Sequence, residues 1–393
     1  MDINLQKRAF ELKDELVEIR RDLHRHPELS FEETRTGDKI EEYLQELGIE
    51  VERGVGKTGL VGYLSGAEEG PTAALRGDID ALPIEEKNEV EYKSQNEGVM
   101  HACGHDVHTT SLLGAAKLLS EVRGELQGDV KFIFQPAEEI NSGARAMMDD
   151  GVLKDPDVDC IFGLHTKPDI EAGKVGVKAG PMMAAVDVLE ITVEGEGGHG
   201  AIPHETRDAI VAGSALVQNL QTVVSRRVSP FENVVVSIGK FNGGEAWNVI
   251  ADRVEMKGTV RTFNPEVQKK LPDILTRIIE NICDAHDTSG DLDYKFDLPA
   301  LINDEKMSHC GKIAARKIVG EEKVISPEPT GGGEDFACFM QEVPGCFFFL
   351  GVRNEEEGIV HQWHHPEFDV DESSLPVGSG ILAQSAVEAL QES

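Results

Sequence analysis

The order of short apolar runs and helical patterns constrains the fold of this chain more than any other feature. Up to about Gly180, runs that predict strands alternate with helical patterns, which is typical of an α/β domain with a mainly parallel sheet flanked by helices. Over residues 184–299 the order becomes βαββαβ, the ferredoxin-like split sandwich. A helix over 306–319 and a strand over 346–352 follow. We therefore predict one discontinuous domain, 1–183 and 300–393, interrupted by an inserted domain, 184–299.

Charge and apolar content exclude several classes of protein. The 38 basic and 72 acidic residues give a formal net charge of −34, which argues against nucleic acid or an anionic membrane surface as a partner. No window approaches the 18 apolar residues of a membrane span, and the N-terminal pattern is an amphipathic helix rather than a signal core. The 6 cysteines lack the density of a disulfide scaffold. These features predict a cytoplasmic protein.

Residues 100–108, Met-His-Ala-Cys-Gly-His-Asp-Val-His, concentrate metal-ligating side chains directly before a helical pattern. Thiolate and imidazole are ligands that Zn²⁺ and similar ions prefer. Gly104 allows the backbone to bend so that Cys103 and His105 face one ion. A polar turn that caps a helix is the alternative. The motif predicts half of a metal site.

Further candidate ligands follow predicted strands. The run 129–135 is stopped by Pro136 and followed by Glu138 and Glu139, although a solvated acidic pair is the alternative there. The run 158–164 places His165 at its end, and a C-terminal cluster contains His361, His364 and His365. Five ligands exceed one tetrahedral site with an open position, so two divalent ions, Zn²⁺, Mn²⁺ or Co²⁺, fit better.

Other charged residues have candidate supporting roles. If the chain after Pro136 stays extended, Glu138 and Glu139 diverge, so that one binds metal and the other acts as general base. Asp80 is a candidate to orient a ligand histidine, with a turn before Pro83 as the alternative. His24 and His26 are predicted to be favourable cations at a helix C-terminus.

Six motifs together resemble a known family. They occur in this order: HACGHDVHTTSLLGAAKLL, FIFQPAEE, GLHTKP, GEGGHGAIPHE, GGGEDF and HHPEFDVDE. The order and spacing are similar to those of the amidohydrolase subgroup of the aminoacylase and glutamate-carboxypeptidase metallopeptidases. This subgroup includes hippurate hydrolase, N-acyl-amino-acid amidohydrolases, N-acetyl-diaminopimelate deacetylase and indole-acetyl-amino-acid hydrolases. The resemblance extends from RRDLHRHPELSFEE to the C-terminus.

The resemblance implies roles for the candidate site residues. It assigns Glu138 as general base, and it selects His364 as the last ligand through the pattern H-x-P-x-F-D, although the adjacent His365 leaves that choice open. The implied metal ligands are Cys103, His105, Glu139, His165 and His364.

The resemblance also gives the inserted domain a role, as a lid and as the surface of a homodimer or higher homo-oligomer. It implies that His199 polarises the scissile carbonyl, whereas a histidine in a glycine-rich turn is the alternative. Asn248 and Arg261 match positions that bind substrate near its carboxylate, a role that suits a guanidinium. Gly333 matches a loop beside the site, with a helix cap as the alternative.

The implied activity is metal-dependent hydrolysis of the amide bond of a small-molecule N-acyl amino acid, N-acetyl or aromatic-acyl. The products are a carboxylic acid and a free amino acid. A dipeptidase or carboxypeptidase of the same superfamily is the nearest alternative. A metal-dependent binding or scaffold protein is the alternative from another class.

Overall fold

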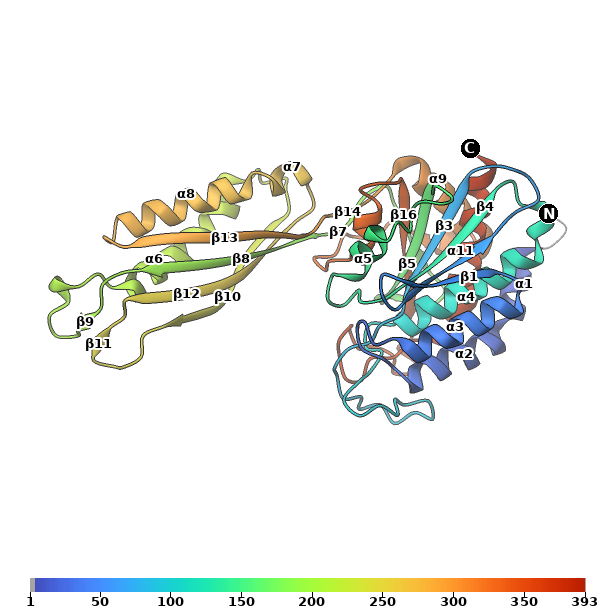
Figure 1. Ribbon diagram of the computed structural model, residues 1–393, viewed down its shortest axis with the longest axis horizontal. Coiled ribbons are helices and arrows are strands. Elements are labelled where there is room, and N and C mark those ends of the chain that lie inside the picture. The colour runs from blue at the N-terminus through green and yellow to red at the C-terminus, as the bar shows by residue number, and fades with distance from the viewer. Residues whose placement is uncertain (1–3, 393) are drawn as a thin grey trace. The chain divides into compact units, whose positions relative to one another are not determined.

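The computed structural model describes residues 4–392, which divide into two compact units (Figure 1). The first unit contains the described residues up to Met182, Ile302–Glu328 and the segment from Asp335 onward. The second unit contains Met183–Leu301 and Pro329–Glu334. The sequence-based boundaries put the segment 329–334 in the first domain. It packs instead on the second unit, where a Cβ at Gly333 would lie 2.3 Å from Val186 Cγ2.

An eight-stranded sheet forms the centre of the first unit. Its four central strands are parallel to one another, and antiparallel strands lie toward both edges. This arrangement confirms the predicted mainly parallel α/β fold. In spatial order the strands are β1 (Glu50–Val55), β2 (Gly59–Leu64), β4 (Asp129–Gln135), β3 (Thr72–Asp78), β5 (Cys160–Glu171), β16 (Gly345–Arg353), β6 (Val175–Gly176) and β15 (Val324–Ile325).

The central strands are almost continuously apolar, as the consecutive phenylalanines of β16 illustrate. Successive side chains point to opposite faces of a strand, so both faces of this sheet must be covered. Phe348 lies beneath Gly311 of α9 (Glu305–Val319), where a Cβ would be 2.8 Å from the ring. On the other face, the ring of Phe347 lies 4.8 Å from Phe336 of α10 (Phe336–Phe339). All three rings are buried.

Helices of the first unit cover this sheet. They include α1 (Leu5–Glu11), α2 (Lys13–Arg25), α3 (Thr34–Glu46), α4 (His105–Glu121), α5 (Gly143–Asp149) and α11 (Leu375–Gln391). The helices α4 and α11 pack against each other and on β3 and β5. Gly114 of α4 permits this approach, because a Cβ there would lie 2.2 Å from Ser379 Oγ. Across residues 4–392, no helix is both long enough and apolar enough to cross a bilayer.

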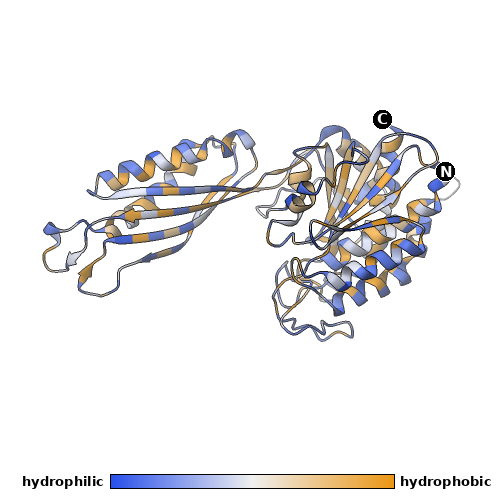
Figure 2. Cartoon of the chain, viewed as in Figure 1, coloured by the Kyte–Doolittle hydropathy of each residue, from blue (hydrophilic) through white to orange (hydrophobic). Residues whose placement is uncertain are grey.

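The second unit confirms the predicted βαββαβ order. Its antiparallel sheet has the order β10-β12-β8-β13, and α6 and α8 cover one face (Figure 1). Hydrophobic and hydrophilic residues alternate along these strands, as expected for a sheet buried on one face (Figure 2). The elements are β8 (Ala185–Glu194), α6 (Ala209–Thr222), β10 (Val234–Gly243), β12 (Arg253–Thr262), α7 (Pro265–Gln268), α8 (Leu271–Asp284) and β13 (Ser289–Leu298). The short strands β9 (Gly198–His199) and β11 (Val249–Ile250) pair in the second unit. The short strands β7 (Gly180–Met183) and β14 (Leu301–Asn303) also pair, and most of their residues belong to the first unit.

Candidate metal centre

The candidate ligands of the first unit gather at the carboxyl ends of the parallel strands. His165 lies inside β5, rather than after the end of the strand as the sequence predicted. The strand is longer than expected because β16 pairs with it as far as Glu171. The pairing of β3 with β5 ends at Gly163, so His165 extends beyond that neighbour and faces the site.

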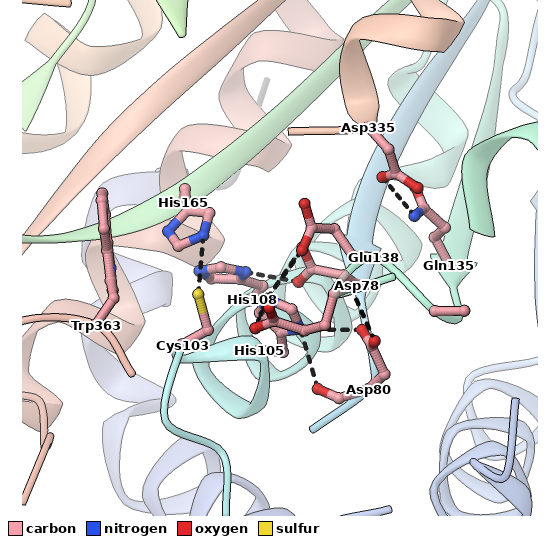
Figure 3. Close-up of polar contacts among 12 residues, drawn as sticks. Asp78, Asp80, Cys103, His105, His108, Gln135, Glu138, His165, Asp335 and Trp363 are labelled. Carbon is pink, nitrogen blue, oxygen red and sulfur yellow. Dashed lines mark hydrogen bonds and ion pairs between the residues drawn. The ribbon is translucent and has the colours of Figure 1, made fainter. Parts of the chain in front are cut away.

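Gly104 gives the Cys-Gly-His motif its shape. Its φ is +89°, a left-handed conformation that glycine adopts without steric cost, and it forms the N-cap of α4. A Cβ at this position would lie 2.7 Å from Thr166 Oγ1. The bend turns Cys103 toward β5, where its Sγ lies 3.5 Å from Nε2 of His165 (Figure 3).

The two adjacent glutamates follow a turn, so the expectation of an extended chain is wrong. Ala137 has a φ of +53°, and its N–H donates to the buried Glu33 at 3.0 Å. The turn brings both carboxylates to the same imidazole. Glu138 Oε2 and Glu139 Oε1 lie 3.9 and 3.7 Å from His105 Nε2.

In His105 and in His165, a hydrogen bond occupies one ring nitrogen and leaves the other available to a cation. His105 Nδ1 lies 2.9 Å from the carbonyl of Asp80 and 3.1 Å from its Oδ1, which leaves Nε2 toward the glutamates. His165 Nδ1 lies 2.8 Å from the carbonyl oxygen of Thr166, which leaves Nε2 toward the thiol. The second oxygen of Asp80 accepts from the N–H of Glu139 at 3.1 Å. Such contacts orient histidine ligands around metals.

The structure separates the two adjacent C-terminal histidines. The N–H of His364 donates to Ala102 O at 2.8 Å, and its Nε2 lies 3.5 Å from Glu139 Oε2. His365 instead stacks on His361 with a ring separation of 4.2 Å. His364 is therefore the one of the pair that joins the candidate ligands.

His108 belongs to the support of the site, because both of its ring nitrogens have partners. Nδ1 lies 2.6 Å from Asp78 Oδ1, and Nε2 accepts the N–H of Thr166 at 2.9 Å. The second oxygen of Asp78 accepts from Arg76 at 2.7 Å. A histidine fixed in this way connects α4 to β5 without offering a nitrogen to a cation.

Sequence reasoning missed a buried polar network beside the site. Arg76 donates to Gln135 at 2.8 Å and to Asp335 at 3.0 Å, and Gln135 also donates to Asp335 at 2.7 Å. Burial raises the pKa of Asp335 to about 6. The available signal was an arginine within the apolar run of β3, since a charged side chain in a buried strand requires partners.

The donor set fits divalent metal ions. His105 Nε2 and Glu139 Oε1 are buried, and neither has a hydrogen-bond partner among the described residues. Burial and the nearby Glu139 raise the pKa of the Cys103 thiol, and burial raises the pKa of Glu139 to about 7. A divalent cation would satisfy the unpartnered atoms and displace these protons. The candidate ligand clusters of the first unit offer the sulfur of a cysteine, the nitrogens of histidines and the oxygens of carboxylates.

In the second unit, His199 lies near Asn248, and Arg261 lies near Gly333. His199 is exposed on β9. The N–H of Gly200, which follows His199, donates to the carbonyl of the exposed Asn248 at 2.8 Å. Arg261 is half-buried on β12, and a Cβ at Gly333 would lie 3.6 Å from its Nη1. Burial lowers the pKa of this guanidinium.

Comparison with known sequences decides the family. The model of peptidase family M20/M25/M40 matches residues 74–388. The chain belongs to this family. The resemblance seen in the motifs is thereby confirmed, together with the prediction of a metal-dependent enzyme that hydrolyses amide bonds.

Individual family members match nearly the whole chain. An N-acetylcysteine deacetylase of Bacillus subtilis is 44% identical over 377 residues, which cover 96% of this chain and 97% of that protein. Thermostable carboxypeptidase 1 of Saccharolobus solfataricus is 39% identical over 389 residues, 98% of each chain. The solved structure of a dinuclear metal-binding M20 peptidase from Bacillus subtilis has a TM-score of 0.86 and 40% identity, and covers 97% of this chain and 99% of its own.

Proposed function

We propose that this M20 enzyme hydrolyses the amide bond of N-acyl amino acids, with an N-acetyl or aromatic acyl group, to a carboxylic acid and a free amino acid. The observation that carries the proposal is the buried Glu138, a second carboxylate beside the candidate ligands, 3.9 Å from His105 Nε2. A site that only stores metal has no need of it. The similarity to an N-acetylcysteine deacetylase supports the acyl-amino-acid class.

The proposed metal ligands form two overlapping groups. Cys103 converges with His105 and His165, and also with Glu139 and His364. A thiolate common to both groups suits two divalent ions, Zn²⁺, Mn²⁺ or Co²⁺, and the similarity to a dinuclear M20 peptidase supports that number. Two such ions, when bound, would polarise the scissile carbonyl and lower the pKa of the attacking water.

The remaining chemistry belongs to side chains of this chain. Glu138 takes a proton from the attacking water and returns it to the nitrogen of the leaving amine. Asp80 holds the His105 ring in the orientation that leaves Nε2 available. By the family resemblance, His199 donates to the scissile carbonyl oxygen, and Arg261, with Asn248 and the open backbone of Gly333, binds the carboxylate of the amino acid.

Assembly and location form part of the proposal. We infer from the family resemblance that the second unit serves as a lid and joins copies of the chain in a homodimer or a higher homo-oligomer. All six cysteines are free and buried, which supports a reducing compartment such as the cytoplasm.

The test compares wild type with Glu138→Gln, after loading with Zn²⁺, Mn²⁺ or Co²⁺, on N-acetyl amino acids, hippurate and dipeptides. We expect Glu138→Gln to lower kcat by about 10²- to 10⁴-fold, the usual contribution of a general base, while metal binding is kept. Glu139→Gln is the matched contrast and should weaken metal binding itself. An active Glu138→Gln variant would refute the assigned role.

The same panel separates the alternatives. Carboxypeptidase activity is the second candidate, because a carboxypeptidase matches 98% of this chain. Faster cleavage of dipeptides than of N-acyl amino acids would favour it. A binding protein would hydrolyse no member when loaded with metal, and its Glu138→Gln variant would bind the same ligands equally well.

A further inference from the structure

Arg20 on α2 connects two segments that are distant in the sequence. Its side chain is fully buried, although arginine is almost never buried without partners. The guanidinium donates to Asp106 Oδ2 at 2.7 Å, to Asp369 Oδ1 at 2.9 Å and to Glu372 Oε1 at 3.4 Å. One planar fork therefore holds the start of α4 and the segment after His364.

The first of these contacts acts at the start of α4. Asp106 directly follows His105 and also binds Nδ1 of His24 at 2.8 Å. Asp106 is buried in the first turn of the helix, so its side chain fixes the start of α4 relative to α2. The Cys-Gly-His segment, residues 103–105, directly precedes this carboxylate in the chain.

The second contact acts on the segment that carries His364. This ligand candidate has a φ of +62°, which a non-glycine residue keeps only where its surroundings fix the backbone. Its side chain is 53% exposed, whereas the side chains of the ligand candidates His105 and His165 are buried. Asp369, five residues later, accepts from Arg20 and from the hydroxyl of Tyr92 at 2.7 Å.

We propose that Arg20 is a positioning residue of the metal centre, which fixes the His364 segment against the Cys-Gly-His segment at the start of α4. This inference rests on the proposed function, because it requires His364 to be a ligand. Arginine suits the role, since its planar fork serves several carboxylates in fixed directions, whereas the compact ammonium of lysine does not. A buried ion cluster is weak evidence for stability alone, so a geometric role is the better explanation.

Arg21 provides a matched control. It makes a pair of hydrogen bonds with the same Glu372, at 2.9 and 2.7 Å, and its guanidinium lies 4.7 Å from the Tyr92 ring, compared with 4.8 Å for Arg20. The contacts to Asp106 and Asp369 belong to Arg20. Arg21→Met therefore removes the contacts of Arg21 to Glu372 and Tyr92 and spares those of Arg20 to Asp106 and Asp369.

The experiment titrates metal-free wild type, Arg20→Lys, Asp369→Ala and Arg21→Met with Co²⁺, followed by calorimetry and visible absorption. We expect Arg20→Lys and Asp369→Ala to bind the weaker of two ions about 10- to 100-fold less tightly, as is typical when a support of a ligand is lost. Arg21→Met should bind as wild type does. Saturating Co²⁺ should restore kcat of both weakened variants without a change in KM.

His364→Ala separates failure of this inference from failure of the proposed function. If it loses one ion while Arg20→Lys and Asp369→Ala bind both ions normally, the positioning role is refuted and the proposed centre stands. If wild type binds fewer than two ions, the proposed centre itself fails. Should Arg20→Lys not fold, Asp369→Ala carries the test, because its side chain is 13% exposed and lies at the edge of the cluster.

Discussion

At the scale of single residues, supports of the ligands determine which atoms can bind a cation. Asp80 and the Thr166 carbonyl each bind one imidazole nitrogen, of His105 and His165 respectively, so the opposite nitrogen of each ring faces the centre. The ring of His108 lies beside those of His105 and His165, but both of its nitrogens have hydrogen-bond partners. Residue type alone therefore cannot distinguish a ligand histidine from a structural one.

His24 illustrates the same limit. The sequence predicted a cation at a helix C-terminus, and His24 does lie in the last turn of α2, but its side chain is fully buried, 2.8 Å from Asp106 and 3.3 Å from Glu86. Burial and Arg20 lower its pKa, but Asp106 and Glu86 outweigh them, so the pKa of His24 is raised. The imidazolium thus contributes stability that is fully present below the unfolded-state pKa and is lost as pH rises through the higher folded-state pKa.

This shift predicts a pH-dependent stability. Above about pH 6.5, the free energy of unfolding of metal-free wild type should fall by at most about 1.4 kcal/mol per pH unit through this one proton. His24→Gln should remove this component. Urea unfolding between pH 6 and 9 measures it, with His26→Gln as the control on the same helix end. Parallel curves for wild type and His24→Gln would contradict the assignment.

At the scale of elements, α4 serves both the core and the site. It begins at His105 and is buried along most of its length against the sheet, α2 and α11. At Gly114, a Cβ would lie 2.2 Å from Ser379 Oγ and 2.7 Å from its Cβ, so the two helices approach closely there. The packing that fixes α4 thereby also fixes the ligands at its start.

Gly114→Ala should destabilise the first unit. The added methyl group forces α4 and α11 apart, which typically costs about 1–3 kcal/mol, although the better helix propensity of alanine returns up to about 1 kcal/mol. Gly124→Ala is the control, because a Cβ there meets no atom within 4 Å. Urea unfolding measures both variants. Equal stability of the two would show that the helices adjust without cost.

At the scale of the whole molecule, the candidate ligands all lie in the first unit. Metal should therefore stabilise that unit by binding its folded state, by about 2.7 kcal/mol when the free ion is at 100 times Kd. Two units need not unfold together. We predict that chelation lowers the melting midpoint of the first unit and leaves that of the second unchanged.

The two tryptophans allow this prediction to be checked. Trp363 lies 4.9 Å from His165 in the first unit, and Trp247 is 97% exposed in the second. In Trp247→Phe, fluorescence reports the first unit alone, while far-ultraviolet circular dichroism reports both. Removal of metal should shift the fluorescence transition, and readded Zn²⁺, Mn²⁺ or Co²⁺ should restore it. A transition that is insensitive to metal would count against the assigned ligands.

The fold was largely predictable because its signals are local. The apolar run 129–135 coincides with β4, since Gly128 and Pro136 limit it, and the βαββαβ order follows from apolar periodicity. The end of β5 was misplaced, because the length of a strand depends on its neighbour β16. The turn at Ala137 was missed, because its partner Glu33 lies about a hundred residues away in the sequence.

The sequence by itself determined the family, the two-domain order and the chemical types of the candidate ligands, because ordered motifs and local periodicity carry that information. Only the tertiary structure decided which of two adjacent histidines meets Glu139, that both glutamates turn toward His105, and that Arg20 links α4 to the His364 segment. The physical reason is that these outcomes depend on hydrogen bonds and packing between residues far apart in the chain, which no local pattern encodes.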